Sequence, residues 1–294
     1  MDSAFRAVAP EELQARLIFA VRAAYQAGEI LRQGYGTSLQ VGRKGEVDLV
    51  TEYDLQSEKA LVELVQREFP GETILAEEGS PTSPPSSSGD QARWLIDPLD
   101  GTTNFAHGLP FFSVSIAWAR DGEPLVGVVY DPLRHELFHA VRGGGAWLGP
   151  PKAAGDPPAQ KPRRLHVSEE TKLGDSLLVT GFPYDIRTNP ENNLNHYAAF
   201  ALRSRAVRRL GSAALDLSYL ASGRFDGYWE LRLSPWDWAA GVLLVREAGG
   251  TVTRADGGPD LWNRPTSLLA TNGRIHEAML EVLLTSRGVE ESKE

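Results

Sequence analysis

The chain has 294 residues, of which 41% are hydrophobic and 23% charged, and its net charge is −9. These proportions are typical of a globular protein, and the length allows one domain or two closely packed halves. The acidic balance disfavours non-specific nucleic-acid binding. The absence of cysteine excludes disulfides, thiolate nucleophiles and Cys-ligated zinc.

The N-terminal sequence lacks the basic and apolar regions of a signal peptide. No apolar run approaches the roughly 20 residues that a membrane-spanning helix needs. We therefore expect a cytoplasmic protein without membrane contact.

Apolar residues at three- and four-residue spacing predict a helix over residues 11–33. A second helix is expected from Asp54, as its N-cap, to Phe69, and a short strand at Ile74–Leu75. The Pro/Ser-rich segment Ser80–Asp90 then separates two acidic motifs. It is either a flap over a site or a tolerated surface insertion, and the sequence leaves both open.

Residues 111–141 predict an antiparallel meander, because three alternating runs are separated by the turn signals Asp121–Gly122 and Asp131–Pro132. The Pro-rich segment 150–162 marks the best internal boundary. After it, strands alternate with helices, which favours an α/β half. The expected strands are 177–180, 225–229 and 267–270, and the expected helices are 191–204, 212–222, 236–248 and 274–286.

Two aspartates carry the strongest chemical signal. The apolar run at residues 94–96 ends at Asp97 and Asp100, and Gly101 and Thr102 follow at once. This order predicts a buried strand that delivers carboxylates to a rim, then a turn whose amides open a helix. Carboxylates bind hard cations such as Mg²⁺, and amides at a helix start bind phosphate. The pattern indicates metal-assisted phosphate chemistry, although an isolated pair of this kind can also be a turn or a cap.

Three further motifs have competing interpretations. Glu77–Glu78 is either a ligand pair or a solvated turn, and Asp237 lies in the first turn of an apolar helix, where capping and metal binding can coexist. His135 to His139 spells H-E-x-x-H, but its surroundings predict a strand rather than the helix of a zinc peptidase. The arginines at 203, 205, 208 and 209 form either a solvated face or a contact surface.

Together these motifs resemble the inositol monophosphatase family of Mg²⁺-dependent, lithium-sensitive phosphatases over about residues 11–285. The matching segments, in chain order, are 47–54, 76–78, 97–103, 209–215 and 236–250. The resemblance implies a five-layer αβαβα sandwich of the α+β class, as in fructose-1,6-bisphosphatase. Residues 1–150 would form an α+β half with most metal ligands, and 151–294 an α/β half with the substrate pocket. The two halves would pack as one catalytic unit, usually in a homodimer.

The resemblance also implies roles for individual residues. Two or three Mg²⁺ ions would be held by Glu77, Asp97, the Leu99 carbonyl, Asp100 and Asp237, with Lys44 near the weakest ion. Thr102 and Glu77 would position and deprotonate the attacking water, supported by Asp48, Thr51 and Asp54. The amides of Gly101 and Thr102 would hold the phosphate, and Asp100, Ala213, Glu230 and Asp237 would face the substrate hydroxyls.

The implied reaction is hydrolysis of a small phosphate monoester by in-line attack of water. Inositol 1-phosphate is the first expected substrate. Fructose 1,6-bisphosphate, histidinol phosphate and NADP(H) are alternatives that would use the same metal site. A hypothesis of another class is a protein-interaction or transcription-associated role, in which the cluster Arg203–Arg209 docks a protein partner.

Overall fold

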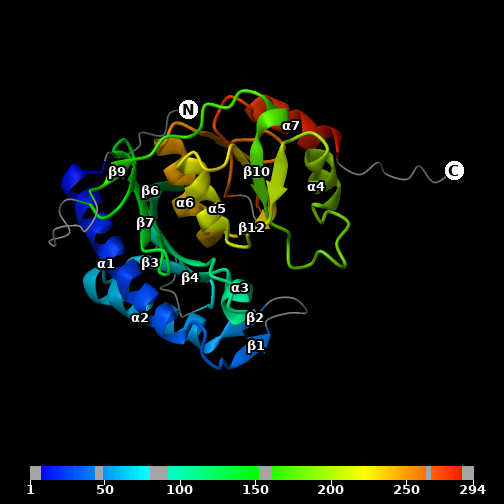
Figure 1. Cartoon of the computed structure of the whole chain (residues 1–294). Coiled ribbons are helices and arrows are strands. Elements are labelled where there is room, and N and C mark those ends of the chain that lie inside the picture. The colour runs from blue at the N-terminus through cyan, green and yellow to red at the C-terminus, as the bar shows by residue number, and fades with distance from the viewer. Residues whose placement is uncertain (1–7, 44–48, 80–91, 152–160, 263–265, 287–294) are drawn as a thin grey trace.

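The computed structural model describes residues 8–43, 49–79, 92–151, 161–262 and 266–286 (Figure 1). Lys44, Asp48 and the segment Ser80–Asp90 lie outside the described residues. None of the helices in the described ranges combines the length and apolarity that a bilayer span requires.

Within the described residues, the two larger of three sheets and six longer helices form five layers (Figure 1). Helices α1 (Pro10–Gly34) and α2 (Glu52–Glu68) cover one face of a seven-stranded sheet. Helices α5 (Ala213–Ala221) and α6 (Pro235–Glu247) lie between that sheet and a five-stranded one. Helices α4 (Leu194–Ala201) and α7 (His276–Thr285) form the outer layer. The predicted αβαβα sandwich is confirmed.

The seven-stranded sheet follows the chain order, with β3 and β4 parallel and the later neighbours antiparallel. Its strands are β3 (Thr73–Ala76), β4 (Ala92–Asp100), β5 (Ser113–Arg120), β6 (Glu123–Asp131), β7 (Glu136–Val141), β8 (Gly145–Leu148) and β9 (Arg163–Arg164). The five-stranded sheet has the order β11 (Ala206–Arg208), β10 (Leu177–Thr180), β12 (Gly227–Leu233), β14 (Thr266–Thr271) and β13 (Thr251–Thr253). The remaining elements are β1 (Val41–Arg43), β2 (Leu49–Thr51), α3 (Thr102–Ala106) and the 3₁₀ turn η1 (Leu173–Asp175).

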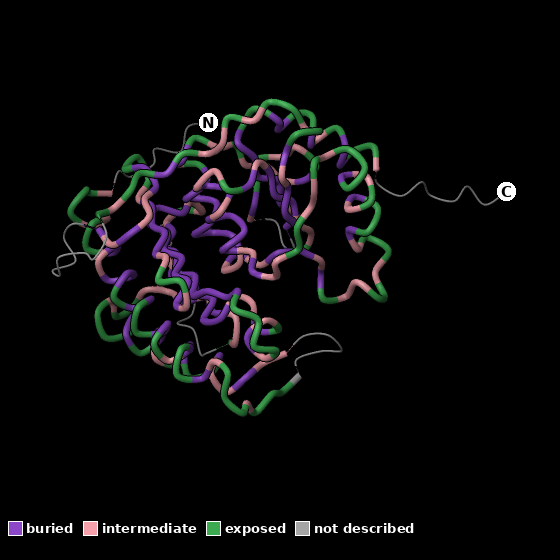
Figure 2. The backbone as a smooth tube through the Cα atoms, viewed as in Figure 1, coloured by how far each residue is buried: buried purple, intermediate pink, exposed green. Residues whose placement is uncertain are grey.

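Three apolar cores fill the spaces between the layers, and the buried backbone runs through the centre of the molecule (Figure 2). In the core under α1, Glu72 accepts hydrogen bonds from two buried indoles, Trp94 Nε1 at 2.7 Å and Trp118 Nε1 at 3.0 Å. Arg16 of α1 forms an ion pair with the same carboxylate. The first helix is thus joined to the sheet by a polar contact inside an apolar layer.

The predicted meander and the three strands of the second half are confirmed, and the differences have local causes. Helix α2 begins at Glu52 because Thr51, not Asp54, is its N-cap; Asp54 closes a capping box by accepting from the Thr51 amide at 2.8 Å. Helix α4 is shorter than residues 191–204, because Asn193 precedes it with φ 73° and β11 follows.

Strands β8, β9, β11 and β13 are too short to leave a pattern in the sequence. Strand β9 pairs with β8, so the first sheet continues beyond residue 150, and the division into halves at that residue stays a prediction. His139 lies on β7, which confirms the strand and leaves no helical H-E-x-x-H.

Helix α6 packs unusually close to β6. A methyl group added to Gly127 would lie 2.9 Å from the Ala240 carbonyl oxygen and 3.0 Å from its Cα. Since backbone atoms cannot move aside like the end of a side chain, Gly127 fixes how near α6 comes to the sheet.

We therefore expect Gly127→Ala to lower the free energy of unfolding by about 1–3 kcal/mol, through overpacking. Urea unfolding measures the effect. The matched control is Gly174→Ala, where the nearest atom is 3.8 Å from the added carbon. Equal stabilities for the two variants would contradict the close-contact argument.

Candidate active site

A pocket of about 320 Å³ opens between the first sheet and the elements of the second half. It collects side chains from the ends of β3 and β4, from the start of α3, from α5 and β12, and from the first turn of α6. Most residues assigned roles from the sequence line it: Glu77, Asp97, Leu99, Asp100, Gly101, Thr102, Ala213, Glu230 and Asp237.

The end of β4 is irregular, and this irregularity places its two aspartates. The pairing with β5 shifts register between Asp97 and Asp100, where Pro98 cannot donate a ladder hydrogen bond. Asp97 is 2% exposed, and its Oδ1 accepts from the Leu99 amide at 3.0 Å. The Pro-Leu pair thus bends the strand end so that both carboxylates reach the pocket.

Asp100 joins the end of β4 to the start of α5. Its Oδ2 accepts from the Ser212 hydroxyl at 2.6 Å and from the Ala214 amide at 2.7 Å, and its Oδ1 accepts from the Ala213 amide at 3.2 Å. These donors belong to the N-terminal turn of α5, where unpaired amides and the helix dipole favour a negative charge.

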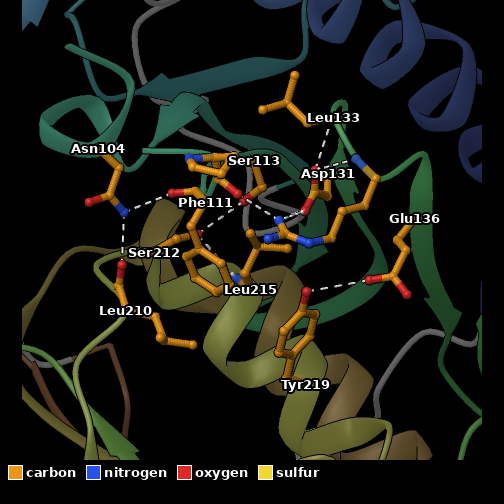
Figure 3. A network of polar contacts seen from close by, with 12 residues as sticks. Asn104, Phe111, Ser113, Asp131, Leu133, Glu136, Leu210, Ser212, Leu215 and Tyr219 are labelled. Carbon is orange, nitrogen blue, oxygen red and sulfur yellow. Dashed lines mark hydrogen bonds and ion pairs between the residues drawn. The ribbon is translucent and has the colours of Figure 1, made fainter. Parts of the chain in front are cut away.

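Asn104 of α3 reinforces the same junction. Its Nδ2 donates to the Phe111 carbonyl at 2.7 Å and to the Leu210 carbonyl at 2.8 Å (Figure 3). Next to it, Gly101 has φ 104°, and an added Cβ would lie 3.2 Å from the Gly211 carbonyl oxygen. Glycine is required there because the turn is left-handed and because two backbone segments meet.

The hydroxyl of Thr102 is held from behind by α2. It lies 2.7 Å from Asp54 Oδ1, while Asp54 Oδ2 accepts from the Thr51 hydroxyl at 2.6 Å. The Leu99 carbonyl is a second possible acceptor for Thr102, at 3.1 Å. With its proton directed to Asp54, Thr102 presents oxygen lone pairs to the pocket.

Asp237 lies in the first turn of α6, where its Oδ2 accepts from the Ser234 amide at 2.7 Å. The capping function predicted for it is confirmed. Its pKa is raised well above the ordinary value, first by burial and then by the charge of Glu77. The same side chain therefore caps a helix and adds negative charge to the pocket.

Glu230 is set in the wall by its neighbours. Tyr228 Oη donates to Glu230 Oε2 at 2.7 Å. An added Cβ on Gly181 would overlap the Glu230 carboxyl group, at 2.1 Å from Oε1, so only glycine leaves room for it. Burial raises the pKa of Glu230 to about 7, although the Tyr228 hydrogen bond opposes the shift.

The carboxylates of the pocket repel one another. Burial, and then the charges of Glu77, Asp100 and Asp237, raise the pKa of Asp97 well above its ordinary value. Burial also raises the pKa of Asp100, to about 6, against the lowering effect of Ser212. Such a group of carboxylates is stabilised when a cation neutralises it.

The donor set suits a hard divalent cation, since it consists of carboxylate and carbonyl oxygens. In the described ranges, however, no three acidic or histidine side chains already stand in an arrangement that encloses a metal ion. Asp100 is committed to α5, Asp237 to Ser234, and Asp97 is hydrogen-bonded to Glu77. An ion would bind by exchanging some of these hydrogen bonds for coordination.

Sequence reasoning missed two groups in this pocket. Asp216 of α5 is 1% exposed, its Oδ1 has no hydrogen-bond partner among the described residues, and burial and Glu230 raise its pKa well above normal. Its position in an otherwise apolar helix was a usable signal. Arg232 also lines the pocket, and its sequence context carried no comparable signal.

Comparison with known proteins assigns this architecture to a family. The model of the inositol monophosphatase family matches residues 12–287. An inositol-1-monophosphatase of Synechocystis is 42% identical over 286 residues, 96% of this chain and 94% of the relative. A Nus factor SuhB of Escherichia coli is 40% identical over 266 residues, 90% of this chain and 94% of the relative.

The solved structure of an inositol monophosphatase from Anabaena superposes with a TM-score of 0.79 at 42% identity. The match covers 93% of this chain and 97% of the other. Both the sequence and the fold are therefore shared over nearly the whole length.

The charge repulsion predicts that Asp97→Asn stabilises the metal-free protein. A carboxyl group with a raised folded-state pKa makes stability fall as pH rises above its unfolded pKa of about 4. Removing the charge should therefore raise the free energy of unfolding by about 1 kcal/mol or more at pH 8, and by less at pH 4. Urea unfolding in EDTA at both pH values measures this.

The control is Asp131→Asn, at a buried aspartate that accepts from the Leu133 amide at 3.0 Å and from Arg134 Nη1 at 2.8 Å (Figure 3). It should destabilise by about 1–3 kcal/mol at neutral pH. Destabilisation by both substitutions would contradict the repulsion argument.

Proposed function

The chain belongs to the inositol monophosphatase family and is a phosphoric monoester hydrolase, and on that premise we propose that it hydrolyses inositol 1-phosphate with Mg²⁺ in this pocket. The observation that carries the proposal is the convergence of Glu77, Asp97, Asp100 and Asp237 beside the start of α3. Carboxylates for a cation and helix-start amides for a phosphate then lie in one pocket.

The proposed ligands for the cations are Glu77, Asp97, Asp100, Asp237 and the Leu99 carbonyl, for two or three ions. Bound Mg²⁺ supplies positive charge that neutralises the phosphate and increases the acidity of a nearby water. Without it, the pocket's own charge would repel an anionic substrate.

The chain's own groups would then orient the reaction. The Thr102 hydroxyl donates to Asp54 Oδ1, with 2.7 Å between the two oxygens, so that a water can donate to the Thr102 oxygen. Glu77 accepts a second proton of that water, and the amides of Gly101 and Thr102 bind the phosphate oxygens. Water attacks phosphorus in line as the ester P–O bond breaks, its proton passes to Glu77, and the departing alkoxide takes a proton from solvent; no covalent enzyme intermediate forms.

The polyol is assigned to the opposite wall. The Glu230 carboxylate, held by Tyr228, accepts from substrate hydroxyls, with the region of Ala213 and Asp237 beside it. Gly181 leaves room for the Glu230 carboxyl group itself, and the small side chain of Ala213 leaves space for a ring. Fructose 1,6-bisphosphate, histidinol phosphate and NADP(H) remain alternatives for the same centre.

On the same premise we propose a cytoplasmic homodimer.

A second candidate function, in transcription, is suggested by the relative that is named a Nus factor. The exposed side chain of Leu202, beside the Arg203–Arg209 cluster, offers a contact surface for it. Two arginines of that cluster already have partners: Arg203 donates to the Ala199 carbonyl at 3.0 Å and Arg205 pairs with Asp175 at 3.0 Å. The phosphatase function is therefore better supported.

The proposal is tested by phosphate release from inositol 1-phosphate, fructose 1,6-bisphosphate, histidinol phosphate and NADP⁺, each with Mg²⁺ and with EDTA. We expect release that needs Mg²⁺ and favours inositol 1-phosphate. Preference for another compound would keep the chemistry and replace the substrate. A folded protein that releases phosphate from none of them would contradict the enzymatic proposal.

Asp97→Asn should lower kcat/KM for inositol 1-phosphate by about 10³-fold or more, because the charge that faces both proposed cation positions is lost. Circular dichroism checks that the fold is retained. Asp175→Asn makes the same chemical change at an exposed site on η1 and should leave turnover unchanged. Near-normal turnover in Asp97→Asn would reject the proposed ligand set.

A further inference from the structure

Arg232 adopts a backbone conformation that disfavours a residue of its size. Its φ is 64°, in the left-handed region, where the other described non-glycine residues are Asp121, His135 and Asn193. Short polar side chains such as Asp and Asn tolerate this region better than a long side chain does. Strain of this kind persists where the surrounding structure enforces it, and such positions cluster at ligand sites.

The cause of the strain is a β-bulge in β12. Glu230 pairs with Leu268, but the next pair is Leu233 with Thr266, so two residues of β12 oppose one residue of β14. Consequently Glu230, Leu231, Arg232 and Leu233 all line the pocket, which the alternation of a regular strand does not allow. The bulge directs an arginine into the wall immediately beyond Glu230.

The direction of the guanidinium is set by the segment that follows β10. Arg232 Nε lies 3.3 Å from Asp185 Oδ2, which also accepts from Asn189 Nδ2 at 2.9 Å. Among the described residues, Arg232 has no ion-pair partner besides Asp185, and it donates no hydrogen bond. A guanidinium held through Nε leaves its terminal N–H groups available to an anion.

A second cation reinforces the position. Arg209 lies just before α5 in the same pocket; burial raises the pKa values of Glu230 and Asp216, and the charge of Arg209 partly opposes that rise. Among the described lining residues, Arg209 and Arg232 are the only cationic side chains, against six carboxylates. Arg232 follows Glu230 on β12, and the charge of Arg209 acts on Glu230, so both cations belong to the part of the pocket that contains Glu230.

We propose that Arg232, with Arg209, forms a second anion subsite, which extends the substrate class to phosphate monoesters that carry a further anionic group. This inference rests on the proposed function, since the first phosphate must occupy the hydrolytic site. The further group is a phosphate or a carboxylate, both of which a guanidinium binds in its plane. The bulge, the strained backbone and the Asp185 contact would then together position the Arg232 guanidinium at this subsite.

The test compares matched substrates that differ only in the second group. Fructose 1,6-bisphosphate is compared with fructose 1-phosphate, and 2-phosphoglycerate with glycerol 2-phosphate, as ratios of kcat/KM. Each ratio is kcat/KM for the substrate with the second anionic group divided by kcat/KM for the one without it. We expect both ratios to exceed one in the parent protein and to decrease at high salt, because the contact is electrostatic. The larger ratio identifies whether phosphate or carboxylate is the preferred group.

Arg232→Gly should lower the ratios by about fivefold or more, the size expected for loss of a charge-assisted hydrogen bond. It should also keep or raise Tm, because glycine accepts φ 64° without strain. Arg232→Lys keeps the charge without the planar fork and should give intermediate ratios. The matched control is Asp121→Gly, which relieves a similar φ of 52° in the β5–β6 turn, outside the pocket. It should leave the ratios unchanged.

Kinetics on these substrates distinguish loss of the hydrolytic function from loss of the second anion subsite. If no phosphate is released from any of these monoesters, the proposed function fails. If fructose 1-phosphate is hydrolysed but the second phosphate and the carboxylate bring no advantage, the inference alone is overturned. Equal ratios in the parent, Arg232→Gly and Arg232→Lys proteins would also overturn it, and would make Arg232 a structural partner of Asp185.

Discussion

The contact between Asp100 and the first turn of α5 is the constraint on which the pocket depends. It connects the end of β4, in the first sheet, to the helix layer that carries the second sheet. Since the donors are a hydroxyl and two helix-start amides, the contact is strong and directional. Asn104 and Gly101 add backbone contacts at the same point. The first sheet and the start of α5 therefore meet with little freedom where the chemistry is proposed.

This junction concentrates charge instead of dispersing it. Helix starts, a capping box and a bulged strand hold the carboxylates in positions where they raise one another's pKa values. Such an arrangement costs stability in the metal-free protein, and a bound cation would offset the repulsion. The close packing of α6 on β6 at Gly127 fixes the position of the helix whose first turn carries Asp237.

Much of this architecture could be predicted from the sequence. The conformation of residues 97–102, a bent strand end followed by a helix start, is determined by neighbouring residues. The position of this segment at the pocket could therefore be predicted from the sequence pattern. The features that could not be predicted depend on contacts between residues that are far apart in the sequence. Whether Asp100 would bond to α5, or Arg232 would fall in a bulge, is decided by register with residues far along the chain. The two-residue strand β9 is invisible for the same reason.

The polar contact that Glu72 makes inside the first core has a spectroscopic consequence. Trp94 and Trp118 donate to this one carboxylate under α1, whereas Trp238 lies in the core between the sheets and Trp229 in the core under α4 and α7. Each apolar layer thus contains its own buried indole emitter, and the pair in the first layer is polarised by a shared anion. Fluorescence of single-tryptophan variants can therefore report separately on each layer and reveal whether the layers lose their structure together or in sequence.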